Sequence, residues 1–322
     1  MKKTTNINNC PICNSTLINR VIIAYDKTMR SLSSLYPSNL FFKDYKKISL
    51  QIYQCQRCSF AFLNPRLSRE GLNQLYGNLY KTVYYDDKRR HKEFQYQDYF
   101  KKLKHLKKDG PGKLLDFGCN TGVFLKIAQD NCWDVMGIEL SYQASQIAKK
   151  RLGNDRIITG AIDELKNLDI QFDIISFLNV LEHLPDPNLY IKIASRKLSP
   201  GGLLFIVVPN YDSIRRILIG ENWSLILLEH INYFTRDSVA YLASNNGLIL
   251  KQGGPIDYEI FNRGFFEKIK KMFRKNEGSS YSFSYGRDAL IKLAFLALIT
   301  DFAGLAINRG DFIYYVMAKK SL

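Results

Sequence analysis

Cysteine is scarce in this sequence, with six residues in a chain of 322. That is too few for a secreted scaffold of this length held together by disulfides. The first residues, MKKTTNINNCPICNS, contain no apolar core and no cleavage site of small residues, so we expect no secretory signal peptide. The expected location is therefore the cytoplasm, where thiols stay reduced.

Acidic residues are also in short supply: 30 Asp and Glu stand against 46 Lys and Arg, which gives a formal net charge of +16. This excess says nothing about the fold, but it suits an acidic partner such as nucleic acid, an anionic membrane or a phosphorylated substrate. The excess is concentrated in two places. Residues 81–108 hold ten Lys and Arg against four Asp and Glu, and residues 263–275 hold six against one.

The remaining composition is that of an ordinary globular protein. Hydrophobic residues make up 46% of the chain and charged residues 24%, which excludes wholesale disorder and permits a real core. At roughly 100–200 residues per domain, 322 residues predict about two domains.

The few cysteines are not scattered. Four of them form two CxxC pairs, Cys10 with Cys13 and Cys55 with Cys58. Each pair directs two thiolates toward one centre, and two pairs complete a tetrahedral four-cysteine zinc site. Such a closed site has no open coordination position, so we expect structural zinc. The alternative is a redox dithiol, which needs only one CxxC within a thioredoxin-like unit.

From residue 113 onward, predicted strands alternate with predicted helices. This alternation predicts an α/β fold with a parallel sheet and right-handed crossovers, in which ligands bind at the carboxyl ends of the strands. Ser141 is the expected N-cap of the second helix. The predicted strands lie at residues 114–117, 135–139, 157–158, 172–177, 203–208 and 312–319, and the first two helices at 123–130 and 142–150.

A dinucleotide-binding glycine fingerprint is missing from the first loop of this region. The three glycine positions are occupied by Gly118, Asn120 and Val123, so a pyrophosphate cradle is not expected. What remains is Asp-x-Gly-x-x-x-Gly, from Asp116 to Gly122, with Glu139 closing the next strand. An acidic residue at that place accepts hydrogen bonds from ribose hydroxyls.

These features resemble the first two motifs of the class I S-adenosylmethionine (SAM) methyltransferases. The segments NVLEHLPDP (179–187), LSPGG (198–202), VPNYDS (208–213) and EHINYFT (229–235) are similar to those of the ubiquinone-biosynthesis-like group. Together with the CxxC pairs and Asn64-Pro65-Arg66, they resemble a bacterial group that carries an N-terminal zinc ribbon and is associated with surface-glycan synthesis.

The resemblance implies a Rossmann-like class I methyltransferase fold with a mostly parallel seven-stranded sheet, a small N-terminal zinc ribbon and a helical C-terminal insertion. The expected organisation is a ribbon at 1–65, linking helices at 66–111, a SAM-binding core at 112–250, the insertion at 251–310 and a final strand at 311–322. The resemblance also implies SAM as cofactor, bound by the following residues: Asp116, Gly118, Cys119, Asn120, Gly122, Glu139, Leu140, Asp163, Leu178 and Asn179. Within this set, Glu139 is expected to bind ribose and Asp163 to contact adenine. Asn120 stands where glycine is common, but asparagine tolerates left-handed backbone angles.

Histidine is rare too, with four residues in the chain. His183 follows the fourth core strand, and its ordinary pKa of about 6.5 suits a general base, although a structural role beside Glu182 is an equal alternative. His230 is a second candidate base. His91 and His105 lie in a Lys-rich predicted helix and are expected to be solvated. No base is evident beside Cys119, so we expect a lining residue there and not a nucleophile.

The predicted insertion contains a basic amphipathic segment at 261–275 and an apolar stretch at 289–307. Lys292 and Asp301 interrupt the apolar stretch, which argues against a membrane span. A helical hairpin fits better, either packed on the domain or in contact with the inner face of the membrane through 261–307. A lid over the substrate with a solvated basic face is the alternative.

The favoured function is O-methylation of a sugar hydroxyl in a nucleotide- or lipid-linked glycan, as in surface-polysaccharide biosynthesis. An RNA methyltransferase is the first alternative. The charge lies outside the ribbon and an Asn/Asp-Pro-Pro-Tyr motif is missing, so a nucleic-acid partner is not expected. A non-catalytic adaptor with the same fold is the second alternative.

Overall fold

A computed structural model of the chain describes residues 4–24, 50–72, 89–107, 109–166, 169–256 and 310–319. The basic segment 261–275 and the apolar stretch 289–307 lie outside these residues. Within the described ranges, no helix combines the length and the apolar character that crossing a membrane requires.

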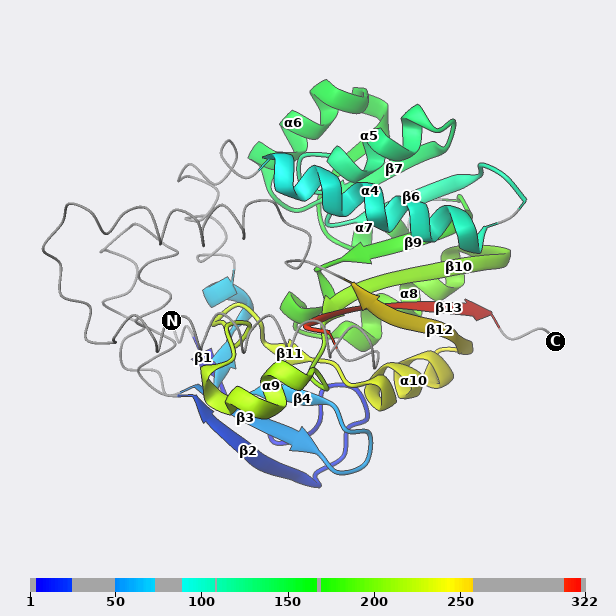
Figure 1. Cartoon of the computed structure of the whole chain (residues 1–322). Coiled ribbons are helices and arrows are strands. Elements are labelled where there is room, and N and C mark those ends of the chain that lie inside the picture. Colours follow the sequence, from blue (N-terminus) through cyan, green and yellow to red (C-terminus); the bar gives the residue numbers. More distant parts are fainter. Residues whose placement is uncertain are drawn as a thin grey trace, which may run out of the picture.

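The centre of the molecule is a seven-stranded sheet in the order β12-β13-β10-β9-β6-β7-β8 (Figure 1). All neighbours from β10 to β8 pair in parallel, and β13 is antiparallel to both β10 and β12. The expected mostly parallel seven-stranded sheet is therefore confirmed. The strands are β6 (Lys113–Phe117), β7 (Asp134–Glu139), β8 (Ile157–Thr159), β9 (Phe172–Leu178), β10 (Leu198–Pro209), β12 (Leu248–Ile256) and β13 (Phe312–Lys319).

Helices cover both faces of this sheet. One face packs against α4 (Arg89–Leu106), α5 (Val123–Asp130) and α6 (Tyr142–Leu152). The other face packs against α7 (Asp163–Lys166), α8 (Pro187–Lys197) and α10 (Arg236–Asn245). Strand residues alternate between the two cores because successive side chains of a strand point to opposite faces: Leu115 and Ile175 lie in one, and Leu114 and Ile174 in the other.

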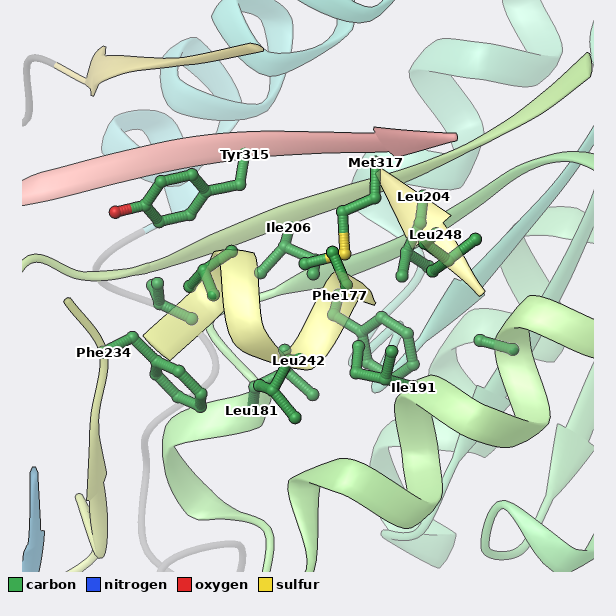
Figure 2. Packing of buried hydrophobic residues seen from close by; sticks show 14 of the residues in the cluster. Phe177, Leu181, Ile191, Leu204, Ile206, Phe234, Leu242, Leu248, Tyr315 and Met317 are labelled. Atoms are coloured by element: carbon green, nitrogen blue, oxygen red, sulfur yellow. The ribbon is translucent and has the colours of Figure 1, made fainter. Parts of the chain in front are cut away.

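Figure 2 shows the core beneath α8 and α10. Ile191 of α8 and Leu242 of α10 meet Phe177, Ile206 and Met317 of the sheet. These side chains are buried, and each fully buried large apolar side chain contributes about 1.5–3 kcal/mol of transfer free energy. Leu181 and Phe234 extend the same cluster toward the cysteine pairs.

A second, four-stranded sheet is antiparallel and has the order β11-β4-β3-β2. Three of its strands come from the N-terminal region: β2 (Ile18–Ala24), β3 (Leu50–Cys55) and β4 (Ala61–Leu63). The fourth, β11 (Asn232–Tyr233), comes from far along the chain, beyond α9 (Ile214–Ile219). The ribbon therefore contributes three strands to a sheet whose fourth strand comes from the core. The bounds of the ribbon, residues 1–65, stay a prediction.

The segment predicted as linking helices begins with a strand instead. β5 (Arg66–Leu67) pairs with β1 (Thr4–Thr5), and a short helical stretch follows at residues 69–72. α4 is the predicted amphipathic helix, with Tyr99 and Leu103 buried against α5. Phe94 does not belong to that buried face and is 71% exposed. Five residues before Tyr99 place it about 140° around the helix.

The boundary at the C-terminal insertion also differs from the prediction. Strand β12 runs to Ile256, six residues past the expected end of the core, because its pairing with β13 continues from Leu248↔Lys319 to Ile256↔Phe312. The final strand, β13, has its expected bounds.

Candidate functional site

The loop between β6 and α5 has the close packing that the glycines predict. Gly118 has a φ of +73°, and a Cβ placed there would lie 2.6 Å from Val180 Cγ2. Gly122 has a φ of +74°, and its Cβ would lie 2.8 Å from Leu152 Cδ1. Both positions therefore need glycine for backbone conformation and for space.

Asn120 adopts the left-handed conformation that the sequence leads us to expect, with a φ of +52°. Its backbone N–H donates to Glu139 Oε2 at 2.8 Å. The turn therefore survives without a third glycine, and it is tied to the end of β7.

Glu139 is the acidic residue best placed to receive a polar ligand. It is 4% exposed, and its Oε1 accepts the Ser141 N–H at 2.7 Å. Burial raises the pKa of this carboxyl, and the backbone N–H groups of Ser141 and Asn120 oppose that rise. Since two carboxylate oxygens offer about four acceptor positions, those two bonds leave capacity for ribose hydroxyls.

Asp116 lies in β6 beneath the loop. It accepts the Ser176 hydroxyl at 2.7 Å, and burial raises its pKa to about 8. Cys119 lies in the loop and is 4% exposed, and burial raises the pKa of its thiol well above the ordinary value. A protonated thiol is a weak nucleophile, which agrees with its expected role as a lining residue.

The other predicted cofactor residues are placed as follows. Leu178 ends β9, which lies beside β6, and Asn179 follows it with a φ of +57°. Leu140 follows Glu139 and is 60% exposed. Asp163 lies at the start of α7, is exposed, and pairs with Lys166 at 2.5 Å. The structure gathers the loop residues around Glu139, whereas the contact of Asp163 with adenine stays a prediction.

His183 and His230 come together from different loops. Their ring centroids lie 4.9 Å apart in an edge-to-face arrangement. His183 ends a short 3₁₀ turn, η2 (Leu181–His183), that follows β9. His230 lies shortly before β11 and is 7% exposed. His105, by contrast, lies exposed on α4, as expected.

Backbone carbonyls fix the tautomer of both imidazoles. His183 Nδ1–H donates to the carbonyl oxygen of Glu229 at 2.9 Å, and His230 Nδ1–H donates to that of Leu225 at 2.9 Å. Because a carbonyl can only accept, each Nδ1 carries the proton and each Nε2 carries a lone pair. Burial lowers the pKa of His183 to about 3 and that of His230 to about 4, so both rings are neutral at physiological pH.

Glu182 completes this cluster, although not in the way the sequence suggests. Glu182 does not orient the His183 ring, because Nε2 lies 3.8 Å from Glu182 Oε1 and Nδ1 bonds to the carbonyl of Glu229 instead. Glu182 is 1% exposed, and burial raises its pKa to about 8. One ligand atom from each of Glu182, His183 and His230 lies within 4.8 Å of the others, so the cluster could also hold a divalent cation.

The four paired cysteines meet in one cluster. Cys10 Sγ lies 3.6 Å from Cys58 Sγ, and Cys13 Sγ lies 3.4 Å from Cys55 Sγ. All four sulfurs lie within 4.8 Å of one another, and none forms a disulfide. Tetrahedral zinc with Zn–S bonds of 2.3 Å needs sulfurs about 3.8 Å apart. The donor set and its spacing therefore fit zinc.

Two residues of this region were not assigned a role from the sequence. Arg66 is 9% exposed and donates from Nη2 to the carbonyl of Pro185 at 2.9 Å. Asn232 is fully buried and donates from Nδ2 to the carbonyls of Leu181 at 3.0 Å and Leu184 at 2.6 Å. Both belong to segments that resemble the glycan-associated group, but only the fold brings them beside His183.

Comparison with known proteins identifies the family. Residues 89–252, about half of the chain, match the family described as methyltransferase domain. The chain is 29% identical over 124 residues to a ubiquinone biosynthesis O-methyltransferase of Idiomarina loihiensis, covering 37% of this chain and 49% of that protein. It is 27% identical over 158 residues to the protein of the same name from Hydrogenovibrio crunogenus, covering 45% and 65%. The matches thus span about half to two thirds of these relatives.

The fold is also that of a solved structure, a SAM-dependent methyltransferase from Archaeoglobus fulgidus. The TM-score is 0.50 at 16% identity, and the alignment covers 74% of this chain and all of that one. With the sheet order, the glycine loop and the family match in agreement, the chain belongs to the methyltransferase domain family.

Proposed function

We propose that this protein transfers the methyl group of SAM to a hydroxyl oxygen, and that the acceptor is a sugar in a nucleotide- or lipid-linked glycan. The observation that carries the proposal is the pair of neutral imidazoles, His230 buried and His183 half-buried, in which each Nε2 carries a lone pair and no proton. A hydroxyl becomes a competent nucleophile when such a group takes its proton. Catalytic imidazoles of this kind contribute about 10²–10⁴-fold to a rate.

The position of the pair relative to the cofactor loop supports this role. Val180, which lies against Gly118, immediately precedes the turn that carries His183. A group on this turn is therefore held close to the loop that we assign to the cofactor. When bound, SAM supplies an activated methyl group on a sulfonium. The chain supplies orientation, and it supplies the lone pair of His183 Nε2 to take the hydroxyl proton as the O–C bond forms and the S–C bond breaks.

The residues that would hold SAM are those gathered around β6 and β7. Gly118 and Gly122 leave space for close approach, and Glu139 would accept the ribose hydroxyls. Zinc in the four-cysteine cluster is part of the proposal as a structural ion. It takes no part in the chemistry, because four thiolates fill its coordination sphere.

The polar character of the region around His183 supports a hydroxyl-rich acceptor. Among the described residues, Arg66 Nη1, Glu182 Oε2 and Asn232 Oδ1 are buried without a hydrogen-bond partner. Buried polar atoms rarely remain unpaired, and a bound ligand is one explanation. A sugar offers many hydroxyls to such atoms, and a guanidinium suits the diphosphate of a nucleotide- or lipid-linked sugar.

The curated relatives favour a second candidate, because they are named ubiquinone biosynthesis O-methyltransferases. Their similarity covers less than half of this chain. A panel of acceptors separates the two candidates: nucleotide sugars, lipid-linked sugars, a ubiquinone precursor and RNA, each incubated with methyl-labelled SAM. We expect label in a sugar hydroxyl. Label in the ubiquinone precursor or in RNA, with none in any sugar, would overturn the acceptor assignment.

The proposed base is tested by His183→Ala and His230→Ala. We expect kcat to fall about 10²–10⁴-fold in at least one variant, with little change in the Kd for SAM. Unchanged turnover in both variants would show that neither histidine is the general base. If turnover of the wild type requires Mg²⁺ or Mn²⁺ and is restored by that ion alone, the histidines and Glu182 serve as metal ligands instead.

A further inference from the structure

The cysteine ribbon contacts both loops that carry the histidine pair. We propose that the ribbon, acting through strand β4 and Asn232, is a positioning element for His183 and His230. It sets the acceptor side of the enzyme without taking part in SAM binding. The inference rests on the proposed function, since it gives the ribbon a role in placing the base.

The first connection is the backbone pairing of β4 with β11. Phe62 pairs with Asn232 and Ala61 with Tyr233. The Leu63 N–H extends the contact by donating to the carbonyl of Ile231 at 3.1 Å. These pairs involve the three residues that follow His230, so β4 fixes the backbone from which that histidine emerges.

The second connection is the side chain of Asn232. Its Nδ2 donates to the carbonyls of Leu181 and Leu184, which flank His183 on either side. The backbone of the same residue pairs with the ribbon strand. Asn232 therefore joins β4 to the turn that carries His183, and Arg66 adds a further bond from the ribbon side, to Pro185.

The third connection leads back to the cysteine cluster. Ser59 follows the second CxxC pair in a left-handed conformation, with a φ of +59°, and its N–H donates to the carbonyl of Cys55. Its carbonyl accepts the Thr235 hydroxyl at 3.3 Å. Next to it, the rings of Phe60 and Phe234 lie 5.2 Å apart. A metal bound by the four cysteines would therefore hold residues 59–60, just before β4, against residues 234–235, just after β11.

The cofactor loop obtains its hydrogen bonds elsewhere. The N–H groups of Gly118 and Cys119 donate to the carbonyl of Ile138, and that of Asn120 donates to Glu139. Both acceptors belong to β7. Disturbing the ribbon should therefore impair placement of the base and leave SAM affinity almost unchanged. A displacement of about 1 Å at a catalytic group can cost about 10²-fold in rate.

The first test is Asn232→Asp in the full chain, with Asn232→Ser as a second variant in case the first does not fold. The carboxylate would place oxygens, without N–H donors, against the two carbonyls. We expect kcat to fall about 10²-fold, with the Kd for SAM within twofold of wild type. Asn246→Asp is the matched control, because Asn246 Nδ2 also donates to a backbone carbonyl, that of Leu242, but on α10. We expect its kcat to be unchanged.

The second test is removal of zinc from the full chain with a chelator, followed by addition of Zn²⁺ alone. Amide hydrogen exchange is the readout, together with the Kd for SAM. We expect faster exchange at residues 230–234 and 181–184 in the zinc-free protein, unchanged exchange in β6 and β7, and reversal on adding Zn²⁺. Equal exchange at 230–234 with and without zinc, or a purified chain that binds no zinc, would overturn the inference.

The two hypotheses fail in different ways. If His183→Ala and His230→Ala both retain turnover, the proposed base is wrong. If those variants lose turnover while the Asn232 variants and the zinc-free protein keep normal kcat, the base stands and the positioning role of the ribbon is wrong. A loss of SAM affinity equal to the loss of kcat would also overturn the positioning role.

Discussion

At the scale of single residues, burial shifts the pKa of several ionisable side chains of this molecule away from their ordinary values. Burial raises the pKa of Asp116 and of Glu182 to about 8, because desolvation penalises a carboxylate. The same effect lowers the pKa of His183 to about 3, because desolvation also penalises an imidazolium. Each of these groups is thereby held neutral near pH 7.

Gly118 offers a sharp test of the cofactor loop. Gly118→Ala would force a Cβ to within 2.6 Å of Val180 in a backbone of φ +73°, and we expect the Kd for SAM to rise about tenfold or more. Isothermal titration calorimetry measures it. Gly201→Ala is the matched control, with a φ of +72° and nothing within 4 Å of the added Cβ. An equal loss of SAM affinity in both variants would point to general destabilisation.

The histidines predict a pH dependence of stability. The pKa of His183 is about 3 when folded and about 6.5 in an unfolded chain, so the unfolded state binds more protons below pH 6.5. Its contribution is fully present above pH 6.5 and is lost as the pH falls toward 3, at about 1.4 kcal/mol per pH unit. His183→Asn should therefore reduce the slope of unfolding free energy against pH between 6.5 and 4 by that amount. Urea unfolding at several pH values measures it.

The buried acids act in the opposite direction. Because the pKa of Asp116 and Glu182 is raised to about 8, their contributions are present below about pH 4 and are lost as the pH rises through 8. Comparing variant with wild type at each pH cancels these acidic contributions. A variant slope equal to that of wild type would show that His183 is protonated in the folded protein.

At the scale of elements, the sequence places caps at the helix starts that flank the site. Ser141 accepts the Ala144 N–H at the start of α6, directly after Glu139. Thr235 and Ser238 form a capping box at the start of α10, directly after β11. These caps satisfy N–H groups that would otherwise be unpaired at the helix ends, and they fix where the loops of the site end.

Ser141→Ala should reduce the free energy of unfolding by about 1 kcal/mol, because it removes the side-chain acceptor of the α6 cap. Chemical denaturation followed by circular dichroism measures this change. Ser244→Ala is the control, since its exposed hydroxyl donates to Tyr241 O within α10. We expect a change there of less than about 0.5 kcal/mol. A stable Ser141→Ala protein would mean that water replaces the cap.

At the scale of the whole molecule, contacts between distant segments connect the ribbon, the loops and the last strand of the sheet. Asp311, just before β13, accepts Trp223 Nε1–H at 3.0 Å and Arg215 Nη1–H at 2.8 Å. Arg215 lies on α9 (Ile214–Ile219), and Trp223 belongs to the core beneath β11. One carboxylate thus holds three segments together at the start of β13.

Asp311→Ala should lower the free energy of unfolding by about 2–3 kcal/mol, because it removes the carboxylate that accepts hydrogen bonds from the mostly buried Arg215 guanidinium and the Trp223 indole N–H. Equilibrium urea unfolding followed by tryptophan fluorescence measures it. Asp134→Ala is the comparison, since Asp134 pairs with Arg156 at the surface, and we expect a change of less than about 1 kcal/mol. Equal changes in the two variants would contradict the structural role of Asp311.

Much of the fold follows from patterns that act over a few residues. The strand–helix alternation predicts β6, α5, β7 and α6 nearly to the residue, because apolar periodicity and capping are local. The positive φ of Asn120 and the glycine loop follow from backbone sterics in the same way. The two CxxC pairs predict the four-sulfur cluster, because each pair directs two thiolates toward one centre.

The contacts that hold His183 and His230 together follow only from the tertiary structure. Glu229, and not Glu182, orients His183 across 46 residues, Asn232 reaches Leu181 across 51, and Thr235 reaches Ser59 across 176. No local pattern encodes such pairs, because loop closure brings distant segments together only when their buried faces fit. Local patterns in the sequence therefore predict six strands of the sheet, the glycine loop and the cysteine cluster. Only the packing of the ribbon against the core decided which two histidines meet, and what holds them there.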